Sequence, residues 1–160
     1  MSDGKRDSFF LLFVCVGNIC RSPMAAGIAR KRFPVGIRVE SAGIAPYGGH
    51  ATPEAVAVMR DGYTIDIGEH LSRDVADLPL ETCDCVVAMD ATVYTRLKEG
   101  GRVDPDRLLR WDIVDPFLQD LEVYGQCAKD ITGRMMELGD VVKGRIGDDG
   151  TLSDNGVVGN

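Results

Sequence analysis

One short segment near the N-terminus, residues 14–23, constrains the fold of this chain more than any other. Its sequence, Val-Cys-Val-Gly-Asn-Ile-Cys-Arg-Ser-Pro, follows an apolar run from Phe9 to Val14 that is typical of a buried strand. Ser22 and Pro23 predict the start of a helix, with serine as the N-cap and proline as the first helical residue. Between strand and helix, the unpaired backbone N–H groups can converge on an anion. The segment therefore predicts a phosphate-binding loop.

Two side chains of this segment add catalytic chemistry to the loop. Cys15 stands where loop N–H groups, a helix N-terminus and the guanidinium of Arg21 favour the thiolate, the form of cysteine that attacks phosphorus. Arg21 can hold two phosphate oxygens at once, and Gly17 lets the backbone approach the ligand closely. The Cys-x5-Arg spacing alone is weak, but the whole string indicates a nucleophile rather than a buried strand-end cysteine. We expect the following residues to bind phosphate: Val16, Gly17, Asn18, Ile19, Cys20, Arg21 and Ser22.

The composition fits a single globular domain. The chain has 160 residues, of which 44% are hydrophobic and 27% charged, and we assign residues 8–144 to one domain with flexible tails at 1–7 and 145–160. The net charge of −7 disfavours nucleic acid and anionic membranes as partners. The longest apolar run, Phe9 to Val16, is too short to span a bilayer.

The cysteines and histidines indicate a reducing compartment and no metal. Five cysteines give an odd count without the density of a disulfide scaffold, which favours the cytoplasm. His50 and His70 are the only histidines, and no Cys/His spacing resembles a zinc site. We expect neither a metal nor a cofactor.

Predicted strands alternate with predicted helices along the chain. The strands are expected at 8–14, 37–40 and 84–89, and the helices at 22–33, 52–62, 77–82 and 91–99. A last helix carries an apolar stripe along one face, formed by Leu121, Tyr124, Ala128, Ile131, Met135, Leu138 and Val142. The alternation predicts an α/β fold with a parallel sheet.

The segment 15–25, Cys-Val-Gly-Asn-Ile-Cys-Arg-Ser-Pro-Met-Ala, resembles the signature of the low-molecular-weight protein tyrosine phosphatase family. Ser41-Ala42-Gly43, Ala88-Met89-Asp90 and Asp115-Pro116-Phe117 resemble further family motifs in the same order, so the resemblance covers roughly residues 8 to 142. The resemblance is to the bacterial members of the family, near the protein arginine phosphatase branch. It implies three layers, with a four-stranded parallel sheet between helices on both faces.

The resemblance also implies roles for residues outside the loop. Asp115, in an Asp-Pro dipeptide, matches the general acid that protonates the leaving oxygen and then activates water against a phosphocysteine. From the residues alone, Asp104 before Pro105 and the nearby Asp112 are rivals.

The resemblance extends to the residues that support the loop. Asn18, Ser41 and His70 resemble the support set, and the Ser22 hydroxyl can bond the thiolate as well as cap the helix. Cys20 is either the partner of a protective disulfide with Cys15 or a small residue that packs the loop.

The leaving group is the open question. Ile19 resembles the residue of the tyrosine-specific members, and Tyr47 and Phe117 are expected to complete an apolar substrate wall. The first choice of substrate is therefore a phosphorylated protein that carries phosphotyrosine. The string Gly-His-Ala-Thr-Pro-Glu-Ala-Val resembles the arginine phosphatases, which makes phosphoarginine the alternative. A thiol-dependent arsenate reductase, which would need Cys83 and Cys85 as a relay, and a noncatalytic phosphate-binding module are further alternatives. The sequence leaves the oligomeric state open.

Overall fold

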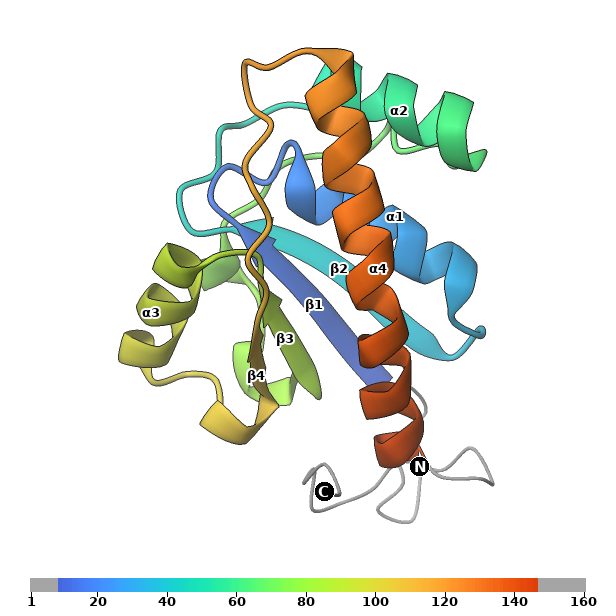
Figure 1. Cartoon of the computed structure of the whole chain (residues 1–160). Coiled ribbons are helices and arrows are strands. Elements are labelled where there is room, and N and C mark those ends of the chain that lie inside the picture. The colour runs from blue at the N-terminus through green and yellow to red at the C-terminus, as the bar shows by residue number, and fades with distance from the viewer. Residues whose placement is uncertain (1–8, 147–160) are drawn as a thin grey trace.

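The computed structural model describes residues 9–146 of the chain and places four parallel strands in one sheet (Figure 1). The strand order is β2-β1-β3-β4, so β1 lies in the interior of the sheet. The elements are β1 (Phe9–Cys15), α1 (Arg21–Arg32), β2 (Ile37–Gly43), α2 (Pro53–Tyr63), β3 (Cys85–Ala88), α3 (Ala91–Gly100), β4 (Leu108–Arg110) and α4 (Leu121–Ile146), with three short 3-10 helices at Val75–Asp77, Leu80–Thr82 and Pro105–Arg107. The predicted α/β fold with a phosphate loop after the first strand is confirmed.

Helices cover both faces of the sheet and enclose two hydrophobic cores. The α1 and α4 helices lie on one face, with α2 packed against α4, while α3 covers the other face (Figure 1). Alternate side chains of a strand point to opposite faces. Accordingly, Phe13 and Cys15 join the core under α1 and α4, whereas Leu12 and Val14 join the core under α3. This alternation directs the Cys15 side chain toward α1.

The α4 helix agrees with its predicted stripe except at the start. Six of the seven predicted positions are buried, but Leu121 is 54% exposed because it is the first residue of the helix and lies at the edge of the packed face. The helix also continues to Ile146, and Arg145 is buried against backbone carbonyls. Residues 145 and 146 therefore belong to the helix and not to the predicted tail, and the other predicted tail residues lie outside the described range.

Local predictions differ from the structure at several elements, including β2, which extends beyond the predicted residue 40 to Gly43. The α1 helix begins at Arg21, so Pro23 is not its first residue, and Ser22 is not the N-cap because its hydroxyl faces Cys15. The helix expected at 77–82 is two 3-10 turns separated by Pro79, which lacks the N–H that a continuous helix needs there. The three-residue strand β4 is too short for its alternation to be recognised. Within residues 9–146, no helix is both long and apolar enough to cross a membrane.

Candidate active site

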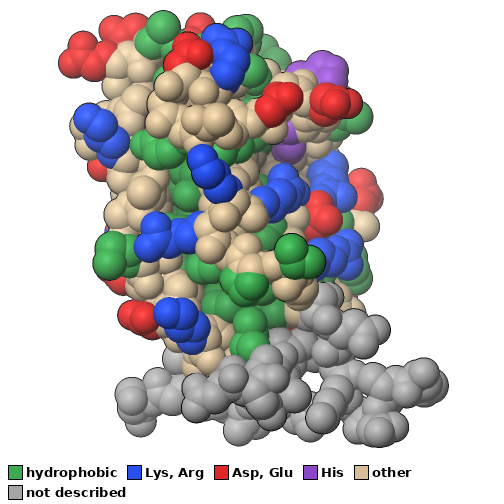
Figure 2. Space-filling model, turned by 90° about the vertical axis from the view of Figure 1, so that its right-hand side faces the viewer, with side chains coloured by type: hydrophobic (Ala, Val, Ile, Leu, Met, Phe, Trp, Pro, Cys, Tyr) green, Lys and Arg blue, Asp and Glu red, His purple; other side chains and the backbone are tan. Residues whose placement is uncertain are grey.

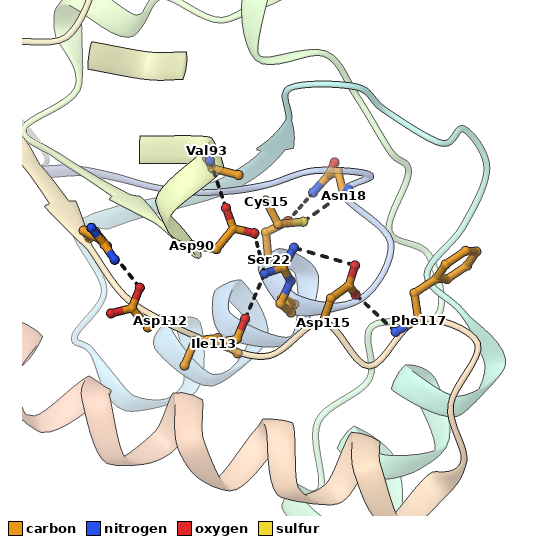
Figure 3. A network of polar contacts seen from close by, with 11 residues as sticks. Cys15, Asn18, Ser22, Asp90, Val93, Asp112, Ile113, Asp115 and Phe117 are labelled. Carbon is orange, nitrogen blue, oxygen red and sulfur yellow. Dashed lines mark hydrogen bonds and ion pairs between the residues drawn. The ribbon is translucent and has the colours of Figure 1, made fainter. Parts of the chain in front are cut away.

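The phosphate loop, residues 15–22, connects the end of β1 to the first turn of α1. Cys15 is the last residue of β1, and its sulfur lies 2.9 Å from the Ser22 hydroxyl and accepts the backbone N–H of Asn18 at 3.2 Å (Figure 3). Both contacts can stabilise negative charge on sulfur. The N-terminus of α1 adds its positive dipole end at the same place. The sulfur of the predicted nucleophile therefore lies among hydrogen-bond donors at the N-terminus of a helix.

Asn18 holds the loop in its unusual shape. Its φ of 58° is in the left-handed region, which asparagine tolerates better than most residues. Its side-chain amide N–H groups donate to Ser22 Oγ at 2.8 Å and to Ser41 Oγ at 3.0 Å. Its backbone carbonyl accepts a hydrogen bond from His70 Nε2 at 2.7 Å. The structure thus brings the predicted support residues together around one asparagine.

Two residues that support the loop escape sequence reasoning. The backbone N–H of Arg73 donates to Asn18 Oδ1 at 3.0 Å, and a backbone contact has no sequence signal. Gly43 lies so close to the loop that a Cβ there would stand 2.4 Å from the Val16 carbonyl oxygen. The glycine of Ser41-Ala42-Gly43 is therefore a steric requirement of the loop, and only its place in the motif could have indicated this.

Arg21 is buried and is fixed by two acceptors. One guanidinium nitrogen, Nη1, donates to Asp90 Oδ2 at 2.8 Å and to the Ile113 carbonyl at 2.9 Å (Figure 3). Burial opposes its charge, but Cys15 and the carboxylates of Asp90 and Asp115 outweigh that cost and raise the pKa of Arg21. The guanidinium therefore stays charged beside the sulfur, and Asp90, which also caps α3, sets its orientation.

Of the three aspartates considered as the acid, Asp115 alone lines the cavity that contains Cys15. Its side chain is 50% exposed, lies 3.8 Å from Arg21 Nη2 and accepts the N–H of Phe117 at 3.1 Å (Figure 3). Asp112 instead pairs with Arg110 at 3.0 Å, and Asp104 caps a 3-10 turn by accepting the N–H of Asp106. The position of Asp115 allows proton exchange with both solvent and a leaving group.

The mouth of this cavity is apolar. The cavity has a volume of about 160 Å³, and Ile19, Tyr47 and Phe117 contribute to its walls. The Tyr47 and Phe117 rings meet edge to face, with centroids 5.4 Å apart and planes at 61°. Such a pair is a surface on which a flat substrate ring can pack. The three residues predicted as the substrate wall therefore lie together beside the loop.

The remaining cysteines are buried thiols without a second thiol in bonding contact. Cys20 Sγ lies 3.2 Å from the Tyr124 hydroxyl, and burial raises the pKa of Cys20. Burial also raises the pKa of Cys83 and of Cys85 to about 12. Cys85 pairs with Leu11 in the sheet, four residues before Cys15 along β1. Neither Cys83 nor Cys85 lines the cavity at Cys15.

Comparisons with known proteins agree with this geometry. The family model described as Low molecular weight phosphotyrosine protein phosphatase matches residues 10–145. A probable low molecular weight protein-tyrosine-phosphatase, EpsP of Ralstonia nicotianae, is 35% identical over 121 residues, which cover 71% of this chain and 82% of the relative. A protein-arginine-phosphatase of Bacillus subtilis is 27% identical over 146 residues, covering 83% and 96%. The crystal structure of a low molecular weight protein tyrosine phosphatase from T. tengcongensis gives a TM-score of 0.76 at 32% identity and covers 83% of this chain and 99% of that one.

Proposed function

Because the chain belongs to the low molecular weight phosphotyrosine protein phosphatase family, whose members are cysteine-dependent phosphomonoester hydrolases, we propose that it hydrolyses phosphotyrosine in proteins through a phosphocysteine. The observation that carries the proposal is a single cavity lined by Cys15, Arg21 and Asp115. These side chains supply a nucleophile, a clamp for the phosphoryl oxygens and a proton donor.

In the first step, the Cys15 thiolate attacks phosphorus and forms the S–P bond while the bond from phosphorus to the phenolic oxygen breaks. Asp115 gives its proton to that oxygen, so tyrosine leaves as a neutral phenol. Arg21 and the backbone N–H groups of residues 16–22 hold the three equatorial oxygens as the phosphoryl group moves.

In the second step, water attacks the phosphocysteine. The Asp115 carboxylate takes a proton from this water, the new O–P bond forms, and the S–P bond breaks to return the Cys15 thiolate and release phosphate. The Ser22 hydroxyl, 2.9 Å from Cys15 Sγ, stabilises the departing thiolate.

The apolar wall supports phosphotyrosine as the substrate. Ile19, Tyr47 and Phe117 present hydrocarbon and ring surface beside the cradle, which suits a phenyl ring better than a charged guanidinium. Phosphoarginine is the second candidate, because the B. subtilis relative named as a protein-arginine-phosphatase aligns with 83% of this chain and Asp115 lies at the mouth, where it can pair with a guanidinium.

A panel of matched peptides tests the substrate. The value of kcat/KM is measured on peptides that differ only in carrying phosphotyrosine or phosphoarginine, with Cys15→Ser and Asp115→Ala as controls for the covalent mechanism. We expect the wild type to prefer phosphotyrosine, and Ile19→Thr to shift activity toward phosphoarginine. A strong wild-type preference for phosphoarginine would reject the first choice, and activity that survives Cys15→Ser would reject the phosphocysteine.

The buried cysteines argue against the third candidate. A thiol-dependent arsenate reductase passes oxidation from the nucleophile to two further cysteines, whereas Cys83 and Cys85 are buried and do not line the cavity at Cys15. Arsenate turnover coupled to thioredoxin would overturn this assignment.

The five free thiols among the described residues also support the cytoplasm as the place where the enzyme acts on phosphorylated proteins.

A further inference from the structure

A second and larger cavity, of about 850 Å³, shares no lining residue with the cavity at Cys15. Its walls come from α1, from the end of β2 and from the segment 64–73. Pockets of this size accommodate small-molecule ligands. Pro23, Ile65, Ile67 and Leu71 give part of the wall an apolar character, and most of the other lining residues are polar or charged. The cavity has no part in the proposed reaction, so its charges call for a separate explanation.

The charges that line the cavity are three cations, Arg30, Lys31 and Arg73, and three carboxylates, Glu40, Asp66 and Glu69. Around Glu40 the positive charge is in excess, because Arg30, at 3.7 Å, and Arg73 share its carboxylate with Arg38, at 3.5 Å, which does not line the cavity. Lys31 also lines the cavity, and its ammonium donates to a backbone carbonyl rather than to a carboxylate. Figure 2, which views this edge of the sheet, shows Lys and Arg side chains grouped around an acidic one.

Several residues of the same cavity hold the phosphate loop, among them Ser72, whose hydroxyl donates to the Gly17 carbonyl at 3.0 Å. Arg73 donates its backbone N–H to Asn18 Oδ1, and its side chain donates to the Ser41 carbonyl at 3.1 Å. His70 bonds the Asn18 carbonyl at 2.7 Å. A ligand beside Arg73 would therefore contact the groups that fix the shape of the phosphate loop.

We propose that this cavity is an effector site that binds a small polyanion, a phosphate or carboxylate compound, between Arg30 and Arg73. Guanidinium groups recognise both kinds of anion through paired N–H donors. The anion competes with Glu40 for these groups, so it must carry at least two negative charges to displace one carboxylate. Asp66 and Glu69 also line the cavity, without an ion pair to these cations among the described residues, and they repel an anion, so binding depends on the contacts with the arginines. The inference does not depend on which phosphorylated residue the enzyme hydrolyses.

NMR titration of the whole chain with pyrophosphate and, separately, with citrate tests the site. The readouts are the His70 imidazole and the side-chain Nε–H groups of Arg30 and Arg73, which line this cavity and not the one at Cys15. Burial lowers the pKa of His70, with Arg30, Arg73 and His50 adding to the effect. An anion beside Arg30 and Arg73 offsets the effect of their positive charges on His70, so binding should raise the pKa of His70. Citrate and pyrophosphate together distinguish a carboxylate ligand from a phosphate ligand.

Matched substitutions assign the binding to the cavity. Arg30→Gln should weaken it by about tenfold or more, since it removes one charged donor. Arg38→Gln, the same change in an arginine that shares Glu40 but does not line the cavity, should weaken it by less than about threefold. Glu40→Gln should tighten it, because the competing carboxylate is gone. Competitive inhibition of para-nitrophenyl phosphate hydrolysis reports binding at Cys15 separately and should be the same in Arg30→Gln as in the wild type.

Three results would overturn the proposal. One is the absence of a saturable change at His70, Arg30 and Arg73 with either probe. Another is equal weakening by Arg30→Gln and Arg38→Gln, which would mean general attraction to a basic surface. The third is weaker binding in Glu40→Gln, since a carboxylate that competes with the ligand cannot assist it. Thermal unfolding of each variant establishes that it is folded, so a loss of binding is attributed to the site.

Discussion

The phosphate loop and the acid loop, residues 112–120, face the same cavity but are held in different ways. In the phosphate loop, Cys15, Asn18 and Ser22 are buried and bonded to one another and to segments distant in the sequence. In the acid loop, Asp115 is half exposed and Leu118 is 84% exposed. The Asp115 carboxylate accepts one N–H from its own loop and lies 3.8 Å from Arg21.

The difference matches the two tasks. A loop that binds an anion through backbone N–H groups is effective only if those groups are fixed before the anion arrives. An acid must instead exchange protons with water and with leaving groups of varied shape, which requires exposure. Substitutions in the phosphate loop should therefore cost both activity and stability, whereas those in the acid loop should cost activity alone.

Arg21→Lys should have the largest effect because Arg21 serves the phosphate and both loops. A lysine ammonium has three donors on a single nitrogen and lacks the planar fork with which Arg21 bonds Asp90 and the Ile113 carbonyl through Nη1 and keeps its other N–H groups for the phosphoryl oxygens. We expect kcat/KM for para-nitrophenyl phosphate to fall by at least about 10³-fold. The matched control is Arg110→Lys, an exposed arginine paired with Asp112, which should stay close to wild type. An Arg21→Lys enzyme with a tenth of the wild-type activity would break the assignment.

Asp115→Asn should lower activity by about 10² to 10³-fold, because a phenol leaves poorly when it is not protonated. The loss should shrink on dinitrophenyl phosphate, whose leaving group needs less protonation. The free energy of unfolding should change by less than about 0.5 kcal/mol, as for other exposed substitutions. Asp112→Asn is the control and should be nearly neutral. An equal loss on both substrates would contradict the role of Asp115 as the acid.

Asn18→Ala should destabilise the fold by about 2 to 3 kcal/mol, since it strains a residue at positive φ and leaves buried partners without bonds. Asn18→Gly separates these causes: glycine accepts the φ but not the bonds, so it should cost about 1 kcal/mol less. Urea unfolding measures both variants. If the two variants are equally stable, the positive φ carries no strain.

Local chemistry alone predicts the parts of the site that lie within one continuous motif, whereas Asp115, Ser41 and His70 follow only from the family resemblance. The order Cys15 to Ser22 requires a strand, a loop and a helix in succession, and the physical chemistry of those elements indicates phosphate binding. Asp90 illustrates the limit, because nothing in its sequence surroundings shows that it orients Arg21, 69 residues away in the chain. Arg73 contributes a backbone N–H, which any residue but proline could supply. Only tertiary structure identifies such contacts.

The short elements were the harder part of the fold. Phe9 to Cys15 is recognisable because an interior parallel strand is apolar on both faces. The strand β4 has only three residues, of which one is buried, one half-buried and one exposed, so it has no continuous apolar run. The sequence predicts two roles for Ser22, as the helix cap and as a partner of Cys15, and the structure shows the contact with Cys15, together with one to Asn18, but not the cap. A functional requirement there overrides the local rule.

The smallest expected effect concerns His70 and the dependence of stability on pH. Burial lowers the pKa of His70 below the ordinary value of 6.5, and Arg30, Arg73 and His50 act in the same direction, while the bond to the Asn18 carbonyl opposes them. Below pH 6.5 the unfolded chain binds a proton at His70 that the folded chain does not yet bind. The free energy of unfolding should therefore fall as the pH drops through 6.5, until the pKa of the folded state is reached.

His70→Gln tests this sign, because glutamine keeps an N–H that can donate to Asn18 but does not titrate. Between pH 7.5 and 5.5, the wild type should lose up to about 1 kcal/mol more stability than His70→Gln. Urea unfolding at several pH values measures both slopes, and His50→Gln controls for the other histidine of the chain. Coincident slopes would mean that the bond to Asn18 fully offsets burial, and then the support of the phosphate loop would not depend on the charge of His70.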